Sequence, residues 1–487
     1  MGRRSCGGKI RLGVGKCAGR RRPEARRCAS PAAAADHPIQ EAGRQTITAT
    51  AGCGVLPCPV LPGSGERPTH HRAADIEAAF GRRIDVARIL IAGAGIGGLA
   101  AAGCLLLAGH EVEIYEQAPE LGEIGAGIQQ SANATHVMRH LGVLDALEDM
   151  AFLPPVTEFR LFDSGEVLQA LALAATHLER HGAPYLQLHR ADYHAVLAAR
   201  IEALKPGCIR LNATAAGFRE NAGRIALVLA DGAEISGDLL IGADGIKSAV
   251  RRRIAGENRP EYTGDSAWRL TVPVERLPSG FLDGKSSIWV GPDKHAVVYF
   301  LRGGSLLNFV GAVELEERIE ESWTQKRPWT ELRADFEGWH RDILTIIEAA
   351  DRDACYRWPL NVHPHLDSWS AGRATLLGDA AHPMLPYMAQ GAAVAVEDGA
   401  ILARALAEAG SIPDALALYE RHRKPRARRI VDESRANRRL FHLPNEAALR
   451  AAFAERNMDR ERSDWLYNYN PLTVDLDQGQ AAAAGSG

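Results

Sequence analysis

The sequence predicts an α/β fold in which a sheet covered by helices is interrupted by a β-rich segment and followed by C-terminal helices. Three observations support this class. A glycine-rich turn joins an apolar strand to a helix near residue 93, two later apolar strands end in turns that pair glycine with aspartate, and residues 286–314 are rich in apolar β-formers. Strands that alternate with helices are typical of a parallel sheet, whereas the β-rich stretch indicates a separate layer.

The composition is that of a globular protein with a sizeable core. Charged residues make up 24% of the 487 residues, and 57 basic against 60 acidic side chains leave a formal net charge of −3. This near-neutral balance disfavours nucleic acid as the main partner. The eight cysteines include no CxxC pair and no zinc-ligand spacing, so we expect reduced thiols, no metal site and a cytoplasmic location.

Residues 1–85 differ in composition from the rest of the chain. The segment begins with an arginine-rich run, shows no apolar periodicity, and lacks the apolar region that a secretory signal requires. We expect a disordered tail, or translated sequence upstream of a later start near Val86. A transit peptide and a basic nucleic-acid-binding arm are the alternatives.

The stretch RILIAGAGIGGLAAAGCLLLAGHEVEIYEQ, residues 88–117, has two interpretations. Residues 89–109 carry no charge and are long enough to cross a membrane. The same stretch contains six glycines, which make a poor membrane helix. A strand over 88–92, a helix over 99–108 and a second strand over 111–115 account for it better. We therefore predict a soluble strand–turn–helix unit and no membrane association.

The turn in this unit has the GxGxxG spacing of a Rossmann-like dinucleotide-binding domain. Gly93 permits the tight bend, Gly95 allows close approach of a pyrophosphate, and Gly98 allows the helix to pack on the strand. The helix N-terminus then faces the phosphates. Glu116, 18 residues after Gly98, stands where an acid can bind ribose hydroxyls. NAD and FAD share this fingerprint, so the motif alone does not choose between them.

Two later strands also end in a turn with an acidic residue. DLLIGADGIKSAVRRRI, residues 238–254, places Asp244 between a strand and a basic helix, where an ordinary helix-capping role is the alternative. In RATLLGDAAHPMLPYMAQGAAVAVEDGA, residues 373–400, a strand ends at Asp379 and a helix opens near Gly391. The aspartate can hold sugar hydroxyls, and the helix N-terminus offers free N–H groups to an anion.

Taken together, GAGIGG, GADGIKSAVR and GDAAHPMLPYMAQGA resemble, in this order and spacing, the single-component FAD-dependent aromatic hydroxylases. The best-known member is para-hydroxybenzoate hydroxylase. The resemblance is greatest to the subgroup of salicylate hydroxylase, 3-hydroxybenzoate 6-hydroxylase and 6-hydroxynicotinate 3-monooxygenase, and runs from about Arg88 to about Tyr469. It implies one FAD, NADH or NADPH as electron donor, O2 as co-substrate, and hydroxylation through a flavin C4a-hydroperoxide. It also allows a homodimer.

The resemblance implies a role for each matched residue. Gly93, Gly95, Gly98 and Glu116 would hold the ADP half of FAD, while Arg190 in LHRADYHAVL would contact the cofactor. Asp379 would bind the ribityl chain, and Asp244 matches an acid linked to FAD and the pyridine nucleotide. Gly391 and Ala392 would face the flavin pyrimidine ring, where a helix N-terminus stabilises the anionic reduced flavin.

These motifs divide the chain into five segments. The expected organisation is an extension (1–85), a first part of the FAD-binding domain (86–262), a β-rich substrate domain (263–355), a second part of the FAD-binding domain (356–445), and a C-terminal segment with a flexible tail (446–487).

The β-rich segment contains a candidate catalytic pair. His295 and Tyr299 are four residues apart, so on a strand they point to the same face. A half-buried His and Tyr satisfied by their neighbours is the alternative. The stretch GPDKHAVVYFLRGG resembles the one that supplies active-site His and Tyr in the subgroup, which favours function. His295 is then the base that removes a phenol proton and Tyr299 its orienting partner.

The predicted substrate is a small aromatic compound, a hydroxylated aromatic carboxylate in particular. Arg302 or Arg269 is a candidate partner for the carboxylate, and a surface ion pair is the alternative for either. Two other functions are open: an FAD-dependent oxidoreductase of the same fold that inserts no oxygen, and a flavin-binding protein without turnover or with a nucleic-acid role.

Overall fold

The computed structural model describes residues 86–122, 127–221, 223–257, 259–315, 326–456 and 463–477. The predicted extension, residues 1–85, lies outside the described residues. The described residues all fall within one compact unit.

The apolar stretch at the start of the described chain divides into a strand and a helix, as predicted. β1 (Arg88–Ala92) leads through the glycine turn into α2 (Ile96–Leu107), and β2 (Glu111–Tyr115) pairs in parallel with β1. Within the described ranges, every helix is too short or too polar to traverse a bilayer. The strand–turn–helix interpretation is therefore confirmed.

β1 belongs to a six-stranded sheet, which we call the nucleotide sheet. Its order is β17-β18-β11-β1-β2-β7, and every neighbouring pair is parallel except β17 with β18. The remaining strands of this sheet are β7 (Ile209–Arg210), β11 (Leu239–Gly242), β17 (Ser370–Ala371) and β18 (Ala374–Leu376). Strands distant in sequence thus bring the three predicted motifs to one sheet.

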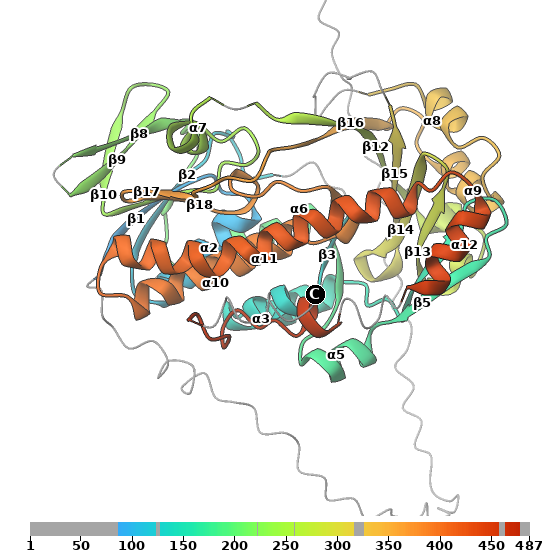
Figure 1. Ribbon diagram of the computed structural model, residues 1–487, viewed down its shortest axis with the longest axis horizontal. Helices are drawn as coiled ribbons and strands as arrows, with labels where there is room; N and C mark the ends of the chain where they lie inside the picture. Colours follow the sequence, from blue (N-terminus) through green and yellow to red (C-terminus); the bar gives the residue numbers. More distant parts are fainter. Residues whose placement is uncertain are drawn as a thin grey trace, which may run out of the picture. The chain divides into compact units, whose positions relative to one another are not determined.

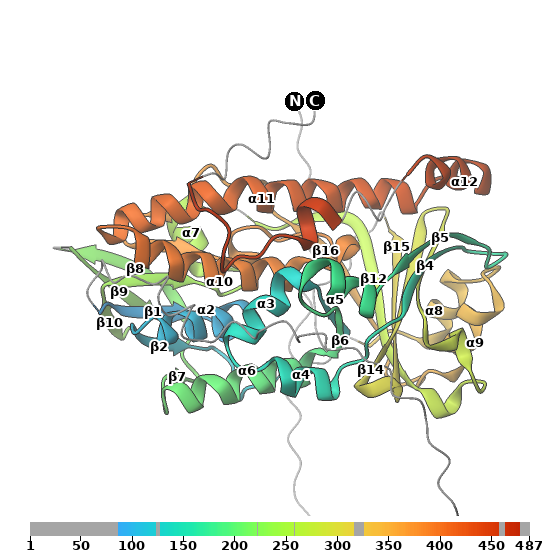
Figure 2. The ribbon, with the colours of Figure 1, turned by 90° about the horizontal axis from the view of Figure 1, so that it is seen from below.

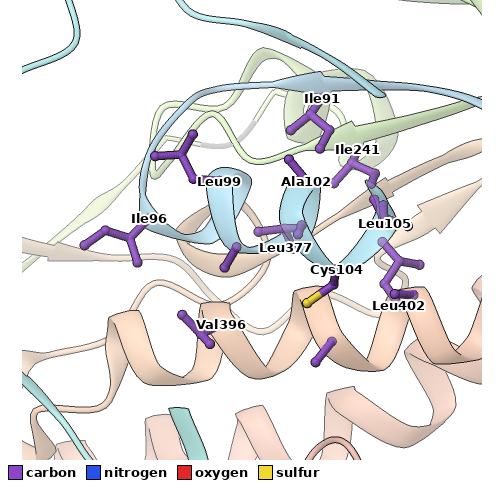
Figure 3. Packing of buried hydrophobic residues seen from close by; sticks show 14 of the residues in the cluster. Ile91, Ile96, Leu99, Ala102, Cys104, Leu105, Ile241, Leu377, Val396 and Leu402 are labelled. Carbon is purple, nitrogen blue, oxygen red and sulfur yellow. The ribbon is translucent and has the colours of Figure 1, made fainter. Parts of the chain in front are cut away.

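The core of this region is formed by the nucleotide sheet, helix α2 and helix α10. Figure 3 shows Leu105 of α2 between Ile241 of the sheet and Leu402 of α10 (Gly391–Glu408), with Leu99 nearer the start of α2 and Ile91 on the sheet. These side chains are fully buried. Because α2 is apolar on every side, it packs against both the sheet and α10.

The second large sheet has seven strands, and we call it the substrate sheet. Its order is β16-β12-β15-β14-β13-β4-β5. The strands are β4 (Val156–Leu161), β5 (Val167–Ala172), β12 (Glu261–Pro273), β13 (Ser286–Gly291), β14 (Lys294–Leu301), β15 (Leu306–Glu314) and β16 (Tyr356–Val362). The antiparallel strands predicted for residues 286–314 are confirmed by the pairing of β13, β14 and β15. Strands β4, β5 and β16 join the sheet from outside residues 263–355, and the five-segment division stays a prediction.

Smaller sheets and helices complete the described structure. The remaining strands are β3 (Gly127–Gln130) with β6 (Leu186–His189), and β8 (Ala215–Asn221), β9 (Arg224–Leu229) and β10 (Glu234–Gly237). The remaining helices are α3 (Ala132–His140), α4 (Leu144–Met150), α5 (Ala175–His181), α6 (Arg190–Leu204), α7 (Ala249–Ala255), α8 (Trp329–Asp335), α9 (Arg341–Ala349), α11 (Ile412–Phe441) and α12 (Glu446–Glu455). The α/β class and the C-terminal helices are confirmed.

The long helix α11 lies beside both sheets. Figures 1 and 2 both show it running from α10, next to the nucleotide sheet, toward α12, next to the substrate sheet. Ser411 caps its N-terminus by accepting a hydrogen bond from the Asp414 amide. One helix therefore contacts the elements that carry both halves of the predicted site.

Replacing Gly98 with alanine tests the close packing of α2 on the glycine turn. A Cβ at this position would lie 2.2 Å from the Gly93 carbonyl oxygen, a backbone atom that cannot rotate away. We expect Gly98→Ala to lower the free energy of unfolding in urea by about 1–3 kcal/mol, in spite of the better helix propensity of alanine.

Gly410 provides the matched control, because a Cβ there meets no atom within 4 Å. Gly410→Ala should change the free energy of unfolding by less than about 0.5 kcal/mol. Equal effects of the two substitutions would contradict the packing argument.

Candidate active site

A cavity of about 360 Å³ brings the predicted cofactor and catalytic residues together. Both sheet systems contribute to its wall: the glycine turn and the start of α10 on one side, and strands β12 to β15 on the other. The predicted site residues that line it are Gly95, Arg190, His295, Tyr299, Asp379, Gly391 and Ala392. The others, Gly93, Gly98, Glu116 and Asp244, do not.

Two helix N-termini meet at this cavity. Gly95 precedes the first turn of α2 and Gln390 that of α10, and no side chain caps either N-terminus. A Cβ added to Gly95 would find no atom within 4 Å, so the space above the turn is open. Free N–H groups and the positive ends of two helix dipoles therefore favour an anionic ligand here.

Glu116 lies beside the glycine turn rather than on the cavity wall. Its carboxylate accepts hydrogen bonds from the backbone amides of Ala94 (2.8 Å) and Ala118 (2.9 Å). Gly93 has φ +102°, and a Cβ there would lie 2.4 Å from the Ala243 carbonyl oxygen. These contacts shape the turn, and the direct ligand role of Glu116 stays a prediction.

Asp244 is engaged in capping a helix. Its carboxylate accepts hydrogen bonds from the Ala249 amide (2.7 Å) and the Val250 amide (3.3 Å) at the start of α7, and from the Ser248 hydroxyl. Burial raises the pKa of Asp244, although these hydrogen bonds oppose the rise. The N-cap residue of α7 is Ser248, and the Asp244 carboxylate supports the same helix start from outside it. A role of Asp244 toward FAD or a pyridine nucleotide stays a prediction.

Asp379 and Arg190 line the cavity from two different elements. Asp379 lies in a short 3-10 turn, η4 (Gly378–Ala380), and Arg190 is the first residue of α6. Surrounding protein raises the pKa of Asp379, whereas the charges of His382 and Arg190 oppose this rise. Its side chain is still accessible from the cavity, so it can accept hydrogen bonds from ligand hydroxyls.

A buried ion pair fixes the turn that carries Asp379. Asp398 of α10 accepts a hydrogen bond from the Gly378 amide (2.9 Å), and its carboxylate lies 2.6 Å from His382 Nε2 and 2.8 Å from Arg423 Nε. Burial alone would raise the pKa of Asp398, but the charges of His382 and Arg423 lower it to about 2. His382 is thus a partner of Asp398 and does not line the large cavity.

The same network ties α10 to two neighbouring helices. Glu397 forms ion pairs with Arg423 (2.7 Å) and Arg426 (2.8 Å) of α11, and it accepts a hydrogen bond from Asn133 of α3. Glu397 and Arg423 are completely buried. Two adjacent acids within the apolar run AVEDGAI were the sequence signal for this network, which our sequence interpretation missed.

One face of the substrate sheet forms the other wall of the cavity. Val297 of β14 stands opposite Val310 of β15, which in turn stands opposite Arg269 of β12. All three line the cavity together with His295 and Tyr299, which lie two residues to either side of Val297. The prediction that His295 and Tyr299 share a face is confirmed.

His295 is buried against aromatic rings. It is 1% exposed and packs edge-on against Tyr387 and Phe441, with ring centroids 4.6 and 5.3 Å apart. Its Nδ1 lies 2.7 Å from Nε2 of His442, the residue that follows α11. Burial, assisted by the neighbouring His442, holds the pKa of His295 well below its usual value, so its imidazole is neutral near pH 7.

Tyr299 and Arg269 form a polar pair at the cavity wall. Burial raises the pKa of Tyr299, so its hydroxyl keeps its proton. Arg269 stacks on Trp358 with the guanidinium 4.6 Å from the ring centroid, and its Nε is buried without a partner. Burial lowers the pKa of Arg269 to about 10, which leaves it charged. Among the described residues no carboxylate pairs with it, so its charge is available to a ligand in the cavity.

Arg302, the other candidate for binding a carboxylate, is a surface residue. Its guanidinium pairs with Asp192 through two contacts of 2.7 and 2.9 Å, and 48% of its side chain is exposed. It does not line the cavity. The surface ion-pair alternative therefore describes Arg302 and not Arg269.

Comparisons with known proteins agree with this arrangement. A family model described as "FAD binding domain" matches residues 86–434. A 3-amino-4-hydroxybenzoate 2-monooxygenase of Streptomyces platensis is 38% identical over 392 residues, covering 80% of this chain and 97% of that protein. A 6-hydroxynicotinate 3-monooxygenase of Bordetella bronchiseptica is 36% identical over 402 residues, covering 82% and 99%.

Solved structures show the same fold. Klebsiella pneumoniae HpxO, in complex with FAD and uric acid, is 26% identical with a TM-score of 0.68, covering 78% of this chain and 96% of that one. A salicylate hydroxylase in complex with its substrate is 25% identical with a TM-score of 0.65, covering 82% and 99%.

The fold and the site define a flavoprotein built on an FAD-binding domain. The chain belongs to the family of FAD-dependent aromatic monooxygenases, which confirms the predicted resemblance. The residues present fit FAD: the open space above Gly95, the two uncapped helix N-termini and the accessible Asp379 suit pyrophosphate, flavin and ribityl groups.

Replacing Asp398 with asparagine tests the buried network. The change leaves Arg423 with a single carboxylate partner in the interior, so we expect the free energy of unfolding to fall by about 3–5 kcal/mol. In the wild type, the depressed pKa of Asp398 adds stability above about pH 4 that is lost as the pH falls toward 2. Urea unfolding at several pH values should show this dependence in the wild type and its loss in Asp398→Asn.

The control is Asp432→Asn on the exposed side of α11, where Asp432 pairs with His365. It should change the free energy of unfolding by less than about 0.5 kcal/mol. A similarly small effect of Asp398→Asn would show that the network is dispensable.

Proposed function

We propose that this monooxygenase hydroxylates a phenolic aromatic carboxylate, using NADH or NADPH as electron donor and O2 as co-substrate. One observation carries the proposal. The neutral imidazole of His295, the protonated hydroxyl of Tyr299 and the guanidinium of Arg269 face the same cavity as the elements suited to FAD. This set can hold an anionic aromatic ring and remove its phenolic proton.

When bound, FAD supplies the redox chemistry: it takes electrons from NADH or NADPH and activates O2 for insertion into the ring. Gly95 and the start of α2 would hold the pyrophosphate, with Gly93, Gly98 and Glu116 shaping the turn around it. Asp379 would hold the ribityl hydroxyls, and Arg190 would contact the cofactor. Gly391 and Ala392 would stabilise negative charge on the flavin.

His295 would accept the phenolic proton of the substrate. Its Nδ1 is engaged with His442, and its Nε2 makes no hydrogen bond among the described residues. Nε2 is therefore the nitrogen available to the substrate. Removing the phenolic proton increases electron density in the ring, which favours attack by an electrophilic oxygen. The Tyr299 hydroxyl would orient the substrate by donating a hydrogen bond, and the apolar wall would exclude water.

Arg269 would bind the substrate carboxylate. Its Nε is buried without a hydrogen-bond partner, which is costly for a charged group, and an anionic ligand removes that cost. Relatives named for 3-amino-4-hydroxybenzoate, 6-hydroxynicotinate and 3-hydroxybenzoate all act on phenol-like rings with a carboxylate, in support of this class.

The test is turnover with these compounds and salicylate. The FAD-loaded enzyme should oxidise NADH or NADPH faster with one of them, and label from ¹⁸O2 should appear in the product. Stimulated oxidation without labelled product would favour the oxidoreductase that inserts no oxygen. Failure of every carboxylated phenol would exclude the proposed substrate class.

His295→Ala tests the assignment of the base. The variant should retain FAD but lose about a hundredfold or more of the coupled hydroxylation rate near pH 7, because no group then accepts the phenolic proton. The rate should recover as the pH passes the phenol pKa of the substrate in solution, since the substrate then binds already ionised. Full coupled hydroxylation by His295→Ala across the pH range would rule out this role.

Arg269→Met tests the carboxylate site. Loss of a charge-assisted hydrogen bond should raise KM for a hydroxybenzoate by about tenfold to hundredfold, with little effect on binding of the corresponding phenol without a carboxylate. Arg302→Met is the matched control and should leave both values unchanged, because Arg302 is paired with Asp192 outside the cavity. An equal loss of affinity for both ligands would indicate a merely structural role for Arg269.

A further inference from the structure

Three side chains form a continuous hydrogen-bonded row that starts at the cavity. His295 Nδ1 lies 2.7 Å from His442 Nε2, and His442 Nδ1 lies 2.8 Å from Glu314 Oε1. His295 lines the cavity, and neither His442 nor Glu314 does. His442 is 7% exposed, whereas 35% of the Glu314 side chain is accessible. The row therefore leads from the buried cavity to a solvent-accessible carboxylate.

The hydrogen bonds fix one arrangement of protons along the row. Because an ionised Glu314 only accepts, His442 must donate from Nδ1 and accept at Nε2. His295 must then donate from Nδ1, which leaves its Nε2 unprotonated. This is the tautomer of His295 that can accept a proton from a ligand in the cavity.

Charged groups surround the row at His442. Burial lowers the pKa of His442, whereas Glu314 and Asp265 of β12 raise it and Arg438 opposes them. The C-terminal end of α11 beside His442 also favours positive charge on its imidazole. Arg438 pairs with Asp265 (2.7 Å) and Glu314 (3.2 Å), and Tyr387 donates a hydrogen bond to Asp265 (2.6 Å). The ligand atoms of Asp265, Glu314 and His442 lie within 4.8 Å of one another, as in a cation site, but Arg438 already pairs with both carboxylates.

We propose that His442 and Glu314 form a proton relay that carries the phenolic proton of the substrate from His295 to the protein surface. The proposal rests on the proposed role of His295 as base. His442 and Glu314 touch no substrate and act through His295.

Each transfer in the relay balances. The phenolic O–H bond breaks as an N–H bond forms at His295 Nε2. The proton on His295 Nδ1 passes to His442 Nε2, and the proton on His442 Nδ1 passes to Glu314, which releases it to water. No imidazole retains a charge at the end. The reverse transfer, when the product leaves as a phenol, restores the starting tautomers.

The relay explains how a poorly basic imidazole can act as the base. Burial and the adjacent His442 hold the pKa of His295 well below its usual value, so an isolated His295 would retain the proton weakly. A row of donors and acceptors removes this difficulty, because the accepted proton is passed on rather than stored.

The experiment measures proton release when a phenol binds, without turnover. Oxidised, FAD-loaded enzyme in weak buffer with a pH-indicator dye is mixed rapidly with 3-amino-4-hydroxybenzoate. We expect a proton to be released on binding to the wild type, and at least about tenfold slower release in His442→Asn and Glu314→Gln, with unchanged ligand affinity. His365→Asn, a histidine paired with Asp432 on the exposed side of α11, is the matched control and should release the proton at the wild-type rate.

A second ligand separates the relay from a structural role. The phenol of 4-hydroxy-3-nitrobenzoate is already ionised at pH 8, so its binding needs no relay and should be equally fast in the wild type and both variants. Slow binding of both ligands would indicate distortion of the cavity and contradict the relay. Unchanged proton release in His442→Asn or, should that variant not fold, in Glu314→Gln would also overturn it. Binding to the wild type without any proton release would instead contradict the role of His295.

Discussion

The ion pair between Asp398 and Arg423 is the interaction on which the rest of the site depends. Both side chains are completely buried, and Asp398 also holds the Gly378 amide and His382. Removing two charges from water is costly, so such a pair adds little net stability compared with apolar packing. The pair does fix the relative positions of α10 and α11, because the two side chains must lie within hydrogen-bonding distance of each other. The turn bearing Asp379 and the start of α10 are consequently held at fixed positions on the cavity wall.

Helix α11 extends this constraint to the substrate sheet. Its first half supplies Arg423 to α10, and its second half supplies Arg438 to Asp265 of β12. Between them, Ser434 donates a hydrogen bond to the Leu385 carbonyl oxygen (2.6 Å), which holds the loop before α10. Figure 2 shows the helix along both regions. One rigid element therefore sets the spacing between the groups suited to FAD and the side chains that would hold the substrate.

Local patterns in the sequence predicted the parts of the fold that depend on neighbouring residues. The bounds of β1 and β2, the start of α10 at Gly391 and the shared face of His295 and Tyr299 all follow from turn chemistry and strand periodicity. Long-range pairings were not predictable. His442 lies 147 residues from His295, and the sequence around it carries no signal of that contact. Likewise, Arg269 and Arg302 are equivalent candidates until the fold places Asp192 beside one of them.

The electrostatics of the cavity favour a ligand that carries negative charge. Two helix N-termini and Arg269 provide positive potential, whereas His295 is neutral and Tyr299 keeps its proton. Asp379 is an acid on the same wall, and the positive charge of Arg190 lies close enough to oppose the rise that burial causes in its pKa. A phenol that loses its proton in this cavity becomes an anion that these positive charges stabilise. In water the same interaction would be screened. The same charges oppose a proton that stays at His295, so the fold favours a substrate bound as its anion and a proton that leaves.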